Sequence, residues 1–459
     1  MKNKKNLVSL TNALKQLPSL VGRGWGRGLH FKQAWNLIKQ EKLFSSIYII
    51  GTGLSITIVM VLSIVFYIKI ANIYPETNRD RMLIVDSGVE KFKNDEGGWW
   101  SSSLSLSVIE TCFQSLESAE AVTALFGESK ENYVQPDGSK EQLPVTVKQV
   151  DTKFWTVFPF RFVSGKPFTD ADFQSGISVA VVAESLAKRL FGTTEVIGKQ
   201  ISLDFRSFRV CGVVKDASYA MQRTYAQLWI PYTLNPQHKE IFGNGGSLGQ
   251  MQAYILAPST SDVERVRQEV IENINRYNQT LGDLEFTVNG QPDRHWQSVF
   301  RYWATDTPNF NKILLQYGFV FFILLLIPAV SLSGMTDSRM ERRMAEMGVR
   351  RAFGAPIHNL MGQIISENFL FTVLGGLIGL LSSYLLILLG RNSVMQLGNT
   401  FIDIPPEGTE VVLSPSMLLN LPVFAIALGI CFFLNLLSAL IPAWQYSHRE
   451  IIHSLNAKS

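Results

Sequence analysis

Charged residues and cysteines are both scarce in this chain. Of its 459 residues only 17% are charged and 46% are hydrophobic, whereas soluble domains carry about 25% charged residues. This deficit indicates lipid-facing helices rather than one very large core, and the length predicts two or more structural units. The three cysteines, Cys112, Cys211 and Cys431, contain no CxxC pair and are too few for a disulfide framework. Cys112 and Cys211 could pair in an oxidising compartment, and two inert buried thiols are at least as good an interpretation.

Catalytic motifs are missing as well. The sequence contains no HExxH, no GxSxG and no Cys/His set with zinc spacing, and its six histidines occur singly. The nearest approach to a phosphate-binding loop, residues 192–200, has one residue too many between Gly192 and Gly198. Gln200 also lacks the hydroxyl with which such a loop binds magnesium. We therefore expect a non-catalytic chain that binds no cofactor or metal of its own.

Four long apolar runs dominate the sequence, at residues 44–68, 313–335, 369–389 and 417–443. Each is about 20 residues or longer, enough to cross a hydrocarbon layer of about 30 Å. The first run is too long for the apolar part of a signal peptide, so we expect it to remain as an anchor. No charged residue lies within a run, which argues against a proton-coupled or ion-coupled pathway through the membrane.

The distribution of Lys and Arg predicts the orientation of these runs. Residues 1–43 hold nine basic residues and one acid, and five arginines lie between the second and third runs. Residues 390–416 contain Arg391 as their only basic residue. Residues 71–311 contain 23 basic and 29 acidic residues. Both termini are therefore predicted in the cytoplasm. The basic N-terminus is interpreted as an orientation signal and not as a nucleic-acid site.

The long segment between the first two runs predicts a mixed α/β domain. Helices are expected at residues 108–118, 184–191 and 261–277, the last with Ser261-Asp262 as its N-terminal cap. Asp137-Gly138 predicts a turn, and the Gly-rich residues 243–249 suggest a boundary between two subdomains. Strands are expected at residues 145–150, 177–182, 209–214 and 285–288.

The predicted fold class is a membrane α-helical protein with four transmembrane helices and a large mixed α+β extracytoplasmic domain between helices 1 and 2. The predicted segments are a cytoplasmic N-terminus with an interfacial amphipathic helix (1–43), transmembrane helix 1 (44–70), the extracytoplasmic domain (71–311), transmembrane helix 2 (312–335), a cytoplasmic coupling loop (336–366), transmembrane helix 3 (367–390), an extracytoplasmic loop (391–416), transmembrane helix 4 (417–443) and a cytoplasmic tail (444–459).

The loop after the second run predicts a short amphipathic helix that ends at Gly354, before Pro356. Its pattern alone favours a solvated helix on the membrane surface, although a methionine stripe also suits a groove in a partner protein. Gly348, inside this helix, costs about 1 kcal/mol relative to alanine and would suit a close backbone approach. The charged face is formed by Arg339, Arg343, Glu346 and Arg350.

The run from Arg339 to Ala355 resembles the signature of FtsX-like/MacB-like ABC transporter permeases, and Glu367 occupies the place of a glutamate near the start of the family's third span. The segment before the second run is similar to the MacB-type periplasmic core domain. The resemblance extends from about residue 28 onward. The motifs that carry it outside the membrane are Val150-Asp151, Phe154-Trp155, Val179–Val182, Phe191-Gly192, Ile197–Lys199 and Gly212–Asp216.

The resemblance implies a permease subunit in the bacterial cytoplasmic (inner) membrane that works with a separate ABC ATPase subunit, which binds the ATP. It also implies a second permease copy or a paralogue as partner, within membrane lipids, with an adaptor and an outer-membrane channel as partners by analogy. The residues expected to couple to the ATPase are Arg339, Arg343, Glu346, Gly348, Arg350, Arg351, Gly354 and Glu367. The small residues Gly51, Ser55, Gly375 and Gly379 are expected to pack transmembrane helices, either between copies or within one chain.

Two alternatives remain open at this stage. One is an extracytoplasmic sensor, although such a receptor would usually carry a cytoplasmic output domain. The other is a membrane scaffold that regulates an extracytoplasmic hydrolase, which is a role found in the same family. The sequence does not choose between export and mechanical regulation, and it identifies no transported substrate.

Overall fold

The computed structural model describes most of the chain, and it divides into two compact units that we describe separately. A helical unit comprises residues 1–64, 315–390 and 420–459, and an α/β unit comprises residues 65–314 and 391–419. The described residues are 42–94, 98–127, 131–138, 141–301, 306–324, 357–391, 415–418 and 421–447, together with Trp35, Lys39, Gln40, Trp303 and Leu326.

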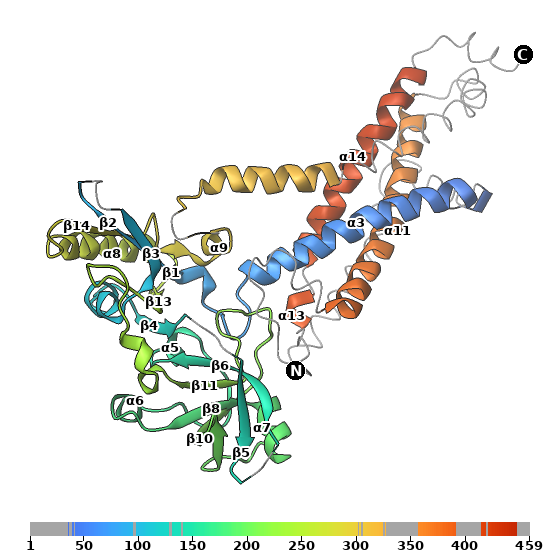
Figure 1. Ribbon diagram of the computed structural model, residues 1–459. Coiled ribbons are helices and arrows are strands. Elements are labelled where there is room, and N and C mark those ends of the chain that lie inside the picture. The colour runs from blue at the N-terminus through green and yellow to red at the C-terminus, as the bar shows by residue number, and fades with distance from the viewer. Residues whose placement is uncertain are drawn as a thin grey trace, which may run out of the picture. The chain divides into compact units, whose positions relative to one another are not determined.

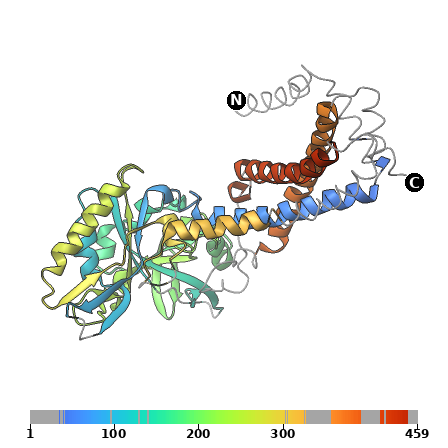
Figure 2. The ribbon, with the colours of Figure 1, turned by 90° about the horizontal axis from the view of Figure 1, so that it is seen from above.

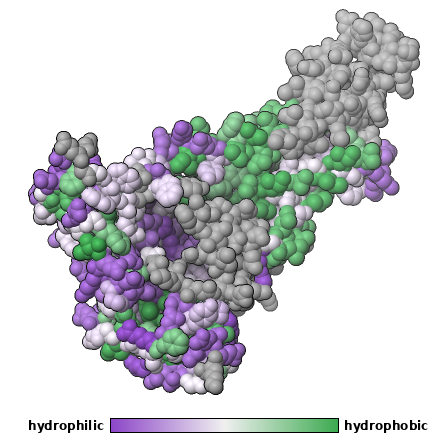
Figure 3. All heavy atoms as spheres, in the orientation of Figure 1, coloured by the Kyte–Doolittle hydropathy of each residue, from purple (hydrophilic) through white to green (hydrophobic). Residues whose placement is uncertain are grey.

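The apolar runs coincide with helices wherever the structure describes them. Helix α3 (Lys42–Ile70) and residues Ile364–Leu389 of α11 (Ile357–Leu389) are long and apolar enough to cross a membrane. The helix Phe310–Leu324 and residues Leu421–Leu437 of α14 (Leu421–Ser447) are apolar but shorter in the described part of the chain. Hydrophobic atoms, green in Figure 3, cover these helices, while purple and white predominate on the α/β unit.

Small residues bring α3 and α11 into close contact within the helical unit. A Cβ atom at Gly379 would lie 2.7 Å from the carbonyl oxygen of Gly53, and one at Gly375 would lie 2.9 Å from Cβ of Thr52. The Thr57 hydroxyl donates to the carbonyl oxygens of Gly53 (2.8 Å) and Gly379 (3.3 Å). The GxxxG pair of α11 therefore lies against α3 of the same chain, a contact in which small residues allow close approach of two backbones.

Six strands of the α/β unit close into a small barrel, at the bottom of Figure 1. The parallel pairing of β11 with β6 completes the ring, because β11 also pairs with β8 at its other edge. Trp229, Phe154 and Phe158 are fully buried in the core beside these strands. The barrel strands are β5 (Glu131–Pro136), β6 (Leu143–Val150), β8 (Val179–Ala183), β9 (Gln200–Leu203), β10 (Arg206–Val214) and β11 (Leu228–Pro231), and β7 (Phe162–Gly165) pairs with β10.

The remaining strands form a second lobe around β13 (Met251–Leu256), which pairs with β1, β3 and β4. Helix α8 (Val263–Asn278) covers one face of this lobe and contributes to a second hydrophobic core (Figures 1 and 2). The other strands are β1 (Met82–Val85), β2 (Gly88–Phe92), β3 (Trp99–Leu104), β4 (Ala121–Phe126), β12 (Leu248–Gly249), β14 (Leu284–Thr287) and β15 (Asp293–Arg294).

Short helical segments complete the unit. The segment η2 (Ile109–Phe113) is a π-helical turn that directly follows α4 (Leu106–Val108). The others are α5 (Phe154–Val157), α6 (Asp170–Gln174), α7 (Glu184–Phe191), α9 (His295–Ser298), α13 (Pro415–Leu418), η1 (Arg79–Arg81), η3 (Tyr232–Leu234) and η4 (Pro236–Lys239).

Most predicted elements are present, with three local differences. The helix expected at residues 108–118 is shorter, and its main part is the π-helical turn. Asp262 is the N-cap residue of α8, but its side chain makes no capping bond; it accepts a hydrogen bond from Ser259 (2.6 Å) and pairs with Arg265 (3.1 Å). Cys112 and Cys211 are free thiols, so the open question of their pairing is answered.

The Gly-rich residues 243–249 lie in the segment that leads from the last barrel strand, β11, to β12 of the second lobe. Their backbone surrounds the buried carboxylate of Glu90, which accepts hydrogen bonds from the amides of Asn244 (2.7 Å) and Gly245 (2.6 Å). A Cβ atom at Gly245 would lie 2.8 Å from a carboxylate oxygen of Glu90, which explains why this residue has no side chain. The stretch thus lies between strands of the two lobes, and glycine at this position is required by a buried charge.

The substitution Gly379→Leu tests the contact between α3 and α11. Because overpacking costs about 1–3 kcal/mol, we expect the melting temperature of the detergent-solubilised full chain to fall by several degrees. Gly362→Leu is the matched control, since it lies in the same helix and a Cβ atom there would meet nothing within 4 Å. Equal melting temperatures for the two variants would contradict the close contact.

Candidate functional site

A cluster of buried and partly buried charges lies, among the described residues, where the chain enters and leaves the α/β unit. Three ion pairs gather there: Glu76 with Arg79, Asp86 with Arg223, and Asp293 with Arg301. They connect the last turn of α3, the barrel loop that contains Arg223 and the segment before the helix Phe310–Leu324. We call these six residues, with His295, the junction.

Arg79 caps the C-terminus of α3. The last carbonyl groups of a helix have no partner within the helix and must be satisfied elsewhere. The Nη1 atom of Arg79 donates to the carbonyl oxygens of Ile68 and Ala71, each at 2.7 Å, and its Nε donates to Glu76 at 2.8 Å. A positive charge is also favourable at a helix C-terminus because of the helix dipole. One side chain thus joins the end of α3 to the α/β unit.

Glu76 is fully buried and has three partners. Besides Arg79, the Thr224 hydroxyl donates to it at 2.8 Å, and Nε2 of His295 lies 3.4 Å from Oε2. Burial raises the pKa of a carboxyl group, but the charge of Arg79 and the bonds from His295 and Thr224 outweigh it and hold the pKa of Glu76 well below its usual range. Glu76 is therefore ionised in the folded protein.

His295 is the neutral member of the junction. Burial, together with the nearby charge of Arg79 and Arg223, lowers the pKa of His295 to about 4, although the bond to Glu76 opposes this shift. The neutral ring donates from Nε2 to Glu76. Its Nδ1 atom is buried and has no hydrogen-bond partner among the described residues.

Arg223 ties the barrel loop to the other two segments. Its guanidinium forms a bidentate pair with Asp86 at 2.8 and 3.0 Å and donates to the Ser298 hydroxyl at 3.1 Å. It also donates to the hydroxyl of Tyr254 at 2.8 Å, and its charge lies 5.4 Å from the centre of that ring. Asp86 follows β1 and Ser298 belongs to α9, so Arg223 fixes both elements to one loop.

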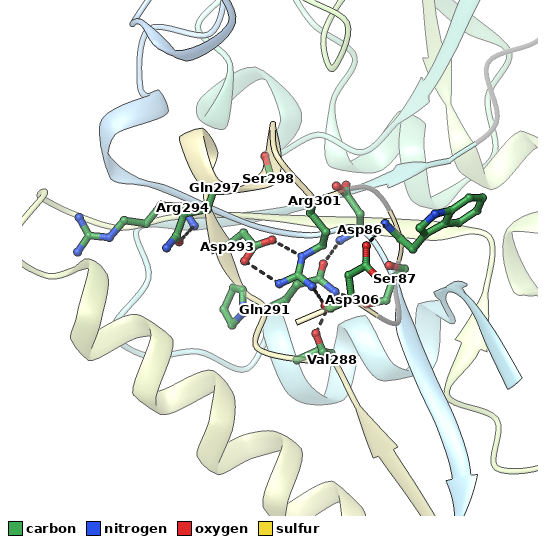
Figure 4. Close-up of polar contacts among 12 residues, drawn as sticks. Asp86, Ser87, Val288, Gln291, Asp293, Arg294, Gln297, Ser298, Arg301 and Asp306 are labelled. Atoms are coloured by element: carbon green, nitrogen blue, oxygen red, sulfur yellow. Dashed lines mark hydrogen bonds and ion pairs between the residues drawn. The ribbon is translucent and has the colours of Figure 1, made fainter. Parts of the chain in front are cut away.

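Arg301 holds the segment that leads to the next apolar helix. In Figure 4 it lies between Asp293 and Asp306: it pairs with the carboxylate of Asp293 at 2.5 and 3.0 Å and donates to the carbonyl oxygen of Asp306. Gln291 fixes the same segment to the end of β1, since it donates to Ser87 at 2.8 Å and accepts from the amide of Asp86 at 2.9 Å.

Aromatic contacts reinforce the attachment of both segments. Phe66, in the last turns of α3, stacks on Phe300 with ring centres 6.2 Å apart, and Trp296 meets Phe310 edge to face at 5.6 Å. Removing one partner of a buried ion pair typically costs about 3–5 kcal/mol. The contacts of the junction are therefore costly to separate. The described residues contain no group of three or more His, Cys, Asp or Glu placed to hold a metal ion.

The residues predicted from the sequence are placed differently. Arg339, Arg343, Glu346, Gly348, Arg350, Arg351 and Gly354 lie outside the described residues. Glu367 lies within α11 and is only 2% exposed. Gly375 and Gly379 lie against α3 as described, and the Ser55 hydroxyl donates to the carbonyl oxygen of Gly51 within α3 (2.9 Å).

Sequence reasoning missed the junction. The spacing of Glu76 and Arg79, just after the first apolar run, was a visible signal for a local ion pair. Nothing in the sequence indicates that this pair is buried, or that Arg223 joins it from a distant loop.

Models of known protein families match most of the chain. The MacB-like periplasmic core domain matches residues 45–273, and the FtsX-like permease C-terminal domain matches residues 318–451. These two matches define a permease of the ABC transporter class. The chain belongs to the MacB-like/FtsX-like family of ABC transporter permeases, as the resemblance implied.

Individual relatives are distant. The uncharacterized ABC transporter permease YknZ of Bacillus subtilis is 21% identical over 52% of this chain, and the macrolide export ATP-binding/permease protein MacB of Marinobacter nauticus is 24% identical over 82%. The pyoverdine export ATP-binding/permease protein PvdT of Pseudomonas savastanoi is 28% identical over 50% of this chain. These matches span 57%, 52% and 33% of the relatives' own lengths, respectively.

Solved structures give weaker likenesses. The extracellular domain of YknZ aligns with 44% of this chain and 99% of that domain, with 17% identity and a TM-score of 0.31. The periplasmic region of MacB from Actinobacillus actinomycetemcomitans aligns with 48% of this chain and 94% of that region, with 17% identity and a TM-score of 0.32.

His295 makes the stability of the junction depend on pH. Its pKa of about 4 in the folded chain lies below the ordinary value of 6.5, so the unfolded chain binds the proton first and stability falls as the pH drops from about 6.5 toward 4. Between pH 7 and 5 we expect the free energy of unfolding to fall by about 2 kcal/mol. The loss from protonation of Glu76 begins only at lower pH, below its ordinary value of 4.5.

His295→Gln should remove most of this loss. Urea unfolding of the detergent-solubilised full chain, followed by tryptophan fluorescence at pH 7 and 5, measures it. His238→Gln is the matched control, because His238 is a buried histidine of the α/β unit that lies outside the junction. If the His295→Gln chain loses as much stability as the wild type over this range, the neutral-histidine assignment is wrong.

Proposed function

We propose that this chain is the permease subunit of an ABC transporter. ATP hydrolysis by a separate nucleotide-binding subunit would move the α/β unit, which is proposed to lie outside the cytoplasm. The observation that carries this proposal is the junction, because buried ion pairs fix both connecting segments to the α/β unit. The proposed topology is four transmembrane helices in the bacterial inner membrane with both termini in the cytoplasm, as the distribution of Lys and Arg predicts.

We propose that a movement of α3 is transmitted to the α/β unit because its last turn is bound there. Arg79 holds the last carbonyl groups of α3 and is itself held by buried Glu76. Sliding α3 away would break the two hydrogen bonds from Arg79 to the carbonyl oxygens of Ile68 and Ala71 and leave those groups without partners, which is costly for buried polar groups. The two-state element that such transmission requires is proposed to be the position of α3 relative to its neighbours.

The ATPase is proposed to bind the cytoplasmic loop at residues 337–353, whose predicted charged face consists of Arg339, Arg343, Glu346 and Arg350. Two copies of the permease, or this chain and a paralogue, would rest on two ATPase subunits. ATP is bound by the partner subunit, and no cofactor is assigned to this chain. The names of MacB and PvdT describe export of a macrolide and of pyoverdine; export is proposed here by family analogy alone, without a substrate.

A role as regulator of an extracytoplasmic hydrolase would use the same movement. ATPase binding does not distinguish it from export. A comparison of substrate efflux with cell-wall phenotypes in a deletion strain separates the two roles, since only export predicts accumulation of a substrate inside the cell.

The proposed ATPase coupling can be tested by purifying the tagged chain from its native membrane with and without Glu346→Lys. We expect a nucleotide-binding subunit to accompany the wild type, and its ATPase activity to be lost or uncoupled in the variant, because the charge on the loop is reversed. A chain that never brings down an ATPase would favour the sensor or scaffold alternative.

Arg301→Met tests transmission through the junction. We expect ATP hydrolysis by the complex to stay within about twofold of the wild type, while the ATP-dependent change in distance between spin labels on two α/β units is lost, because Asp293 no longer holds the connecting segment. Arg265→Met is the matched control, since its ion pair with Asp262 is largely exposed and such pairs contribute about 0–1 kcal/mol. Unchanged label movement in Arg301→Met would refute transmission at this site.

A further inference from the structure

A cavity of about 410 Å³ opens in the α/β unit between its two hydrophobic cores. Phe173, which lines the cavity, packs against both cores, so the cavity lies where the barrel meets the second lobe. Its volume falls within the range of about 300–1,000 Å³ that is usual for small-molecule sites. Neither the junction nor the ATPase-coupling residues take part in it.

Two buried polar groups line the cavity. Tyr232 is only 4% exposed, and its hydroxyl group makes no hydrogen bond to any of the described residues. Asp151, 5% exposed, is held by the Thr123 hydroxyl (2.5 Å) and by the amides of Phe154 and Ala124 (each 2.9 Å). The amide of Lys153 also bonds this carboxylate, so Asp151 is held in place by four donors, about as many as a carboxylate accepts.

The electrostatic character of the cavity is negative. Four carboxylates line it against one ammonium group, that of Lys153, which gives a formal charge of −3. Glu120 pairs with Arg81, and Asp170 accepts from Thr152. Glu110 has no hydrogen-bond or ion-pair partner among the described residues. Burial and the nearby charges of Asp151 and Glu110 raise the pKa of Tyr232, so its hydroxyl stays protonated.

The local backbone places Glu110 at this site. Glu110 lies in the π-helical turn η2, and Gln114, which directly follows that turn, also lines the cavity. Such turns are rare and are found disproportionately at functional sites. The lining also includes the apolar side chains of Leu116, Val122 and Phe173.

We propose that this cavity binds an organic cation. An ammonium or guanidinium group would lie among Asp151, Glu110 and the hydroxyl oxygen of Tyr232. Glu110 and Tyr232 can accept its N–H hydrogen bonds, and the charge of Asp151 attracts it. The apolar part of the ligand would pack against Leu116, Val122 and Phe173. The ligand can be a free amine or the side chain of a basic peptide, because both present the same chemical group. The proposal does not depend on ATP-driven movement.

Isothermal titration of the full chain in lipid nanodiscs tests this proposal. The probes are 2-phenylethylamine, its neutral analogue 2-phenylethanol, and the tripeptide Gly-Lys-Gly. We expect at least one of the two cationic probes to bind, and 2-phenylethanol to bind at least about tenfold more weakly than 2-phenylethylamine if the latter binds. Binding of the amine but not the peptide identifies a small-molecule amine, and binding of the peptide alone identifies a peptide side chain.

Two near-isosteric variants assign the binding to this cavity. Glu110→Gln and Tyr232→Phe should each weaken binding of the cation by about threefold to tenfold, and both keep the shape of the side chain they replace. Glu117→Gln, an exposed glutamate that follows the same turn but does not line the cavity, is the control and should bind like the wild type. Failure of both cations to bind, equal binding of the amine and the alcohol, or insensitivity to both variants would overturn the proposal.

Discussion

Arg79 links the end of α3 to the buried charges of the junction. Arg79 satisfies two carbonyl groups at the end of the helix and neutralises Glu76, and Glu76 in turn positions His295 and Thr224. These partners come from three separate parts of the chain. Because an unpaired buried charge is so costly, the three parts keep one arrangement, and the entry and exit segments of the unit are fixed together.

The two lobes differ in how they are built. The barrel is closed by the pairing of β11 with β6 and needs no further strand at that edge, whereas the second lobe is a sheet organised around β13 and covered by α8. Arg223 belongs to the barrel side of the chain but bonds to Asp86 and Ser298 of the second lobe. The lobes are therefore joined by the guanidinium of Arg223 and by Phe173, which packs against both hydrophobic cores. The cavity that Phe173 lines lies between the two lobes.

The elements that sequence reasoning predicted well are those with a local pattern. The apolar runs, the strand at residues 209–214 and helix α7 could be located because each is marked by consecutive or alternating hydrophobic residues. The π-helical turn was not predicted, because its hydrophobic spacing over five residues resembles that of an ordinary helix. Glu90 and the Gly-rich loop could not be connected either, since their contact spans more than 150 residues. Family motifs indicated the permease class but gave no indication of the junction, which depends on tertiary contacts.

The order of synthesis gives the junction a further property. Strand β1 pairs with β13 and β15, and Glu76 contacts His295, so these contacts can form only after those later parts of the chain have been synthesised. Pairings this distant in sequence form late, because the intervening chain must first be brought together. The barrel strands β5 to β11 follow one another closely in the chain and can pair before these contacts form. The buried charge of Glu76 therefore gains its contact with His295 only after a segment more than 200 residues downstream has folded against it.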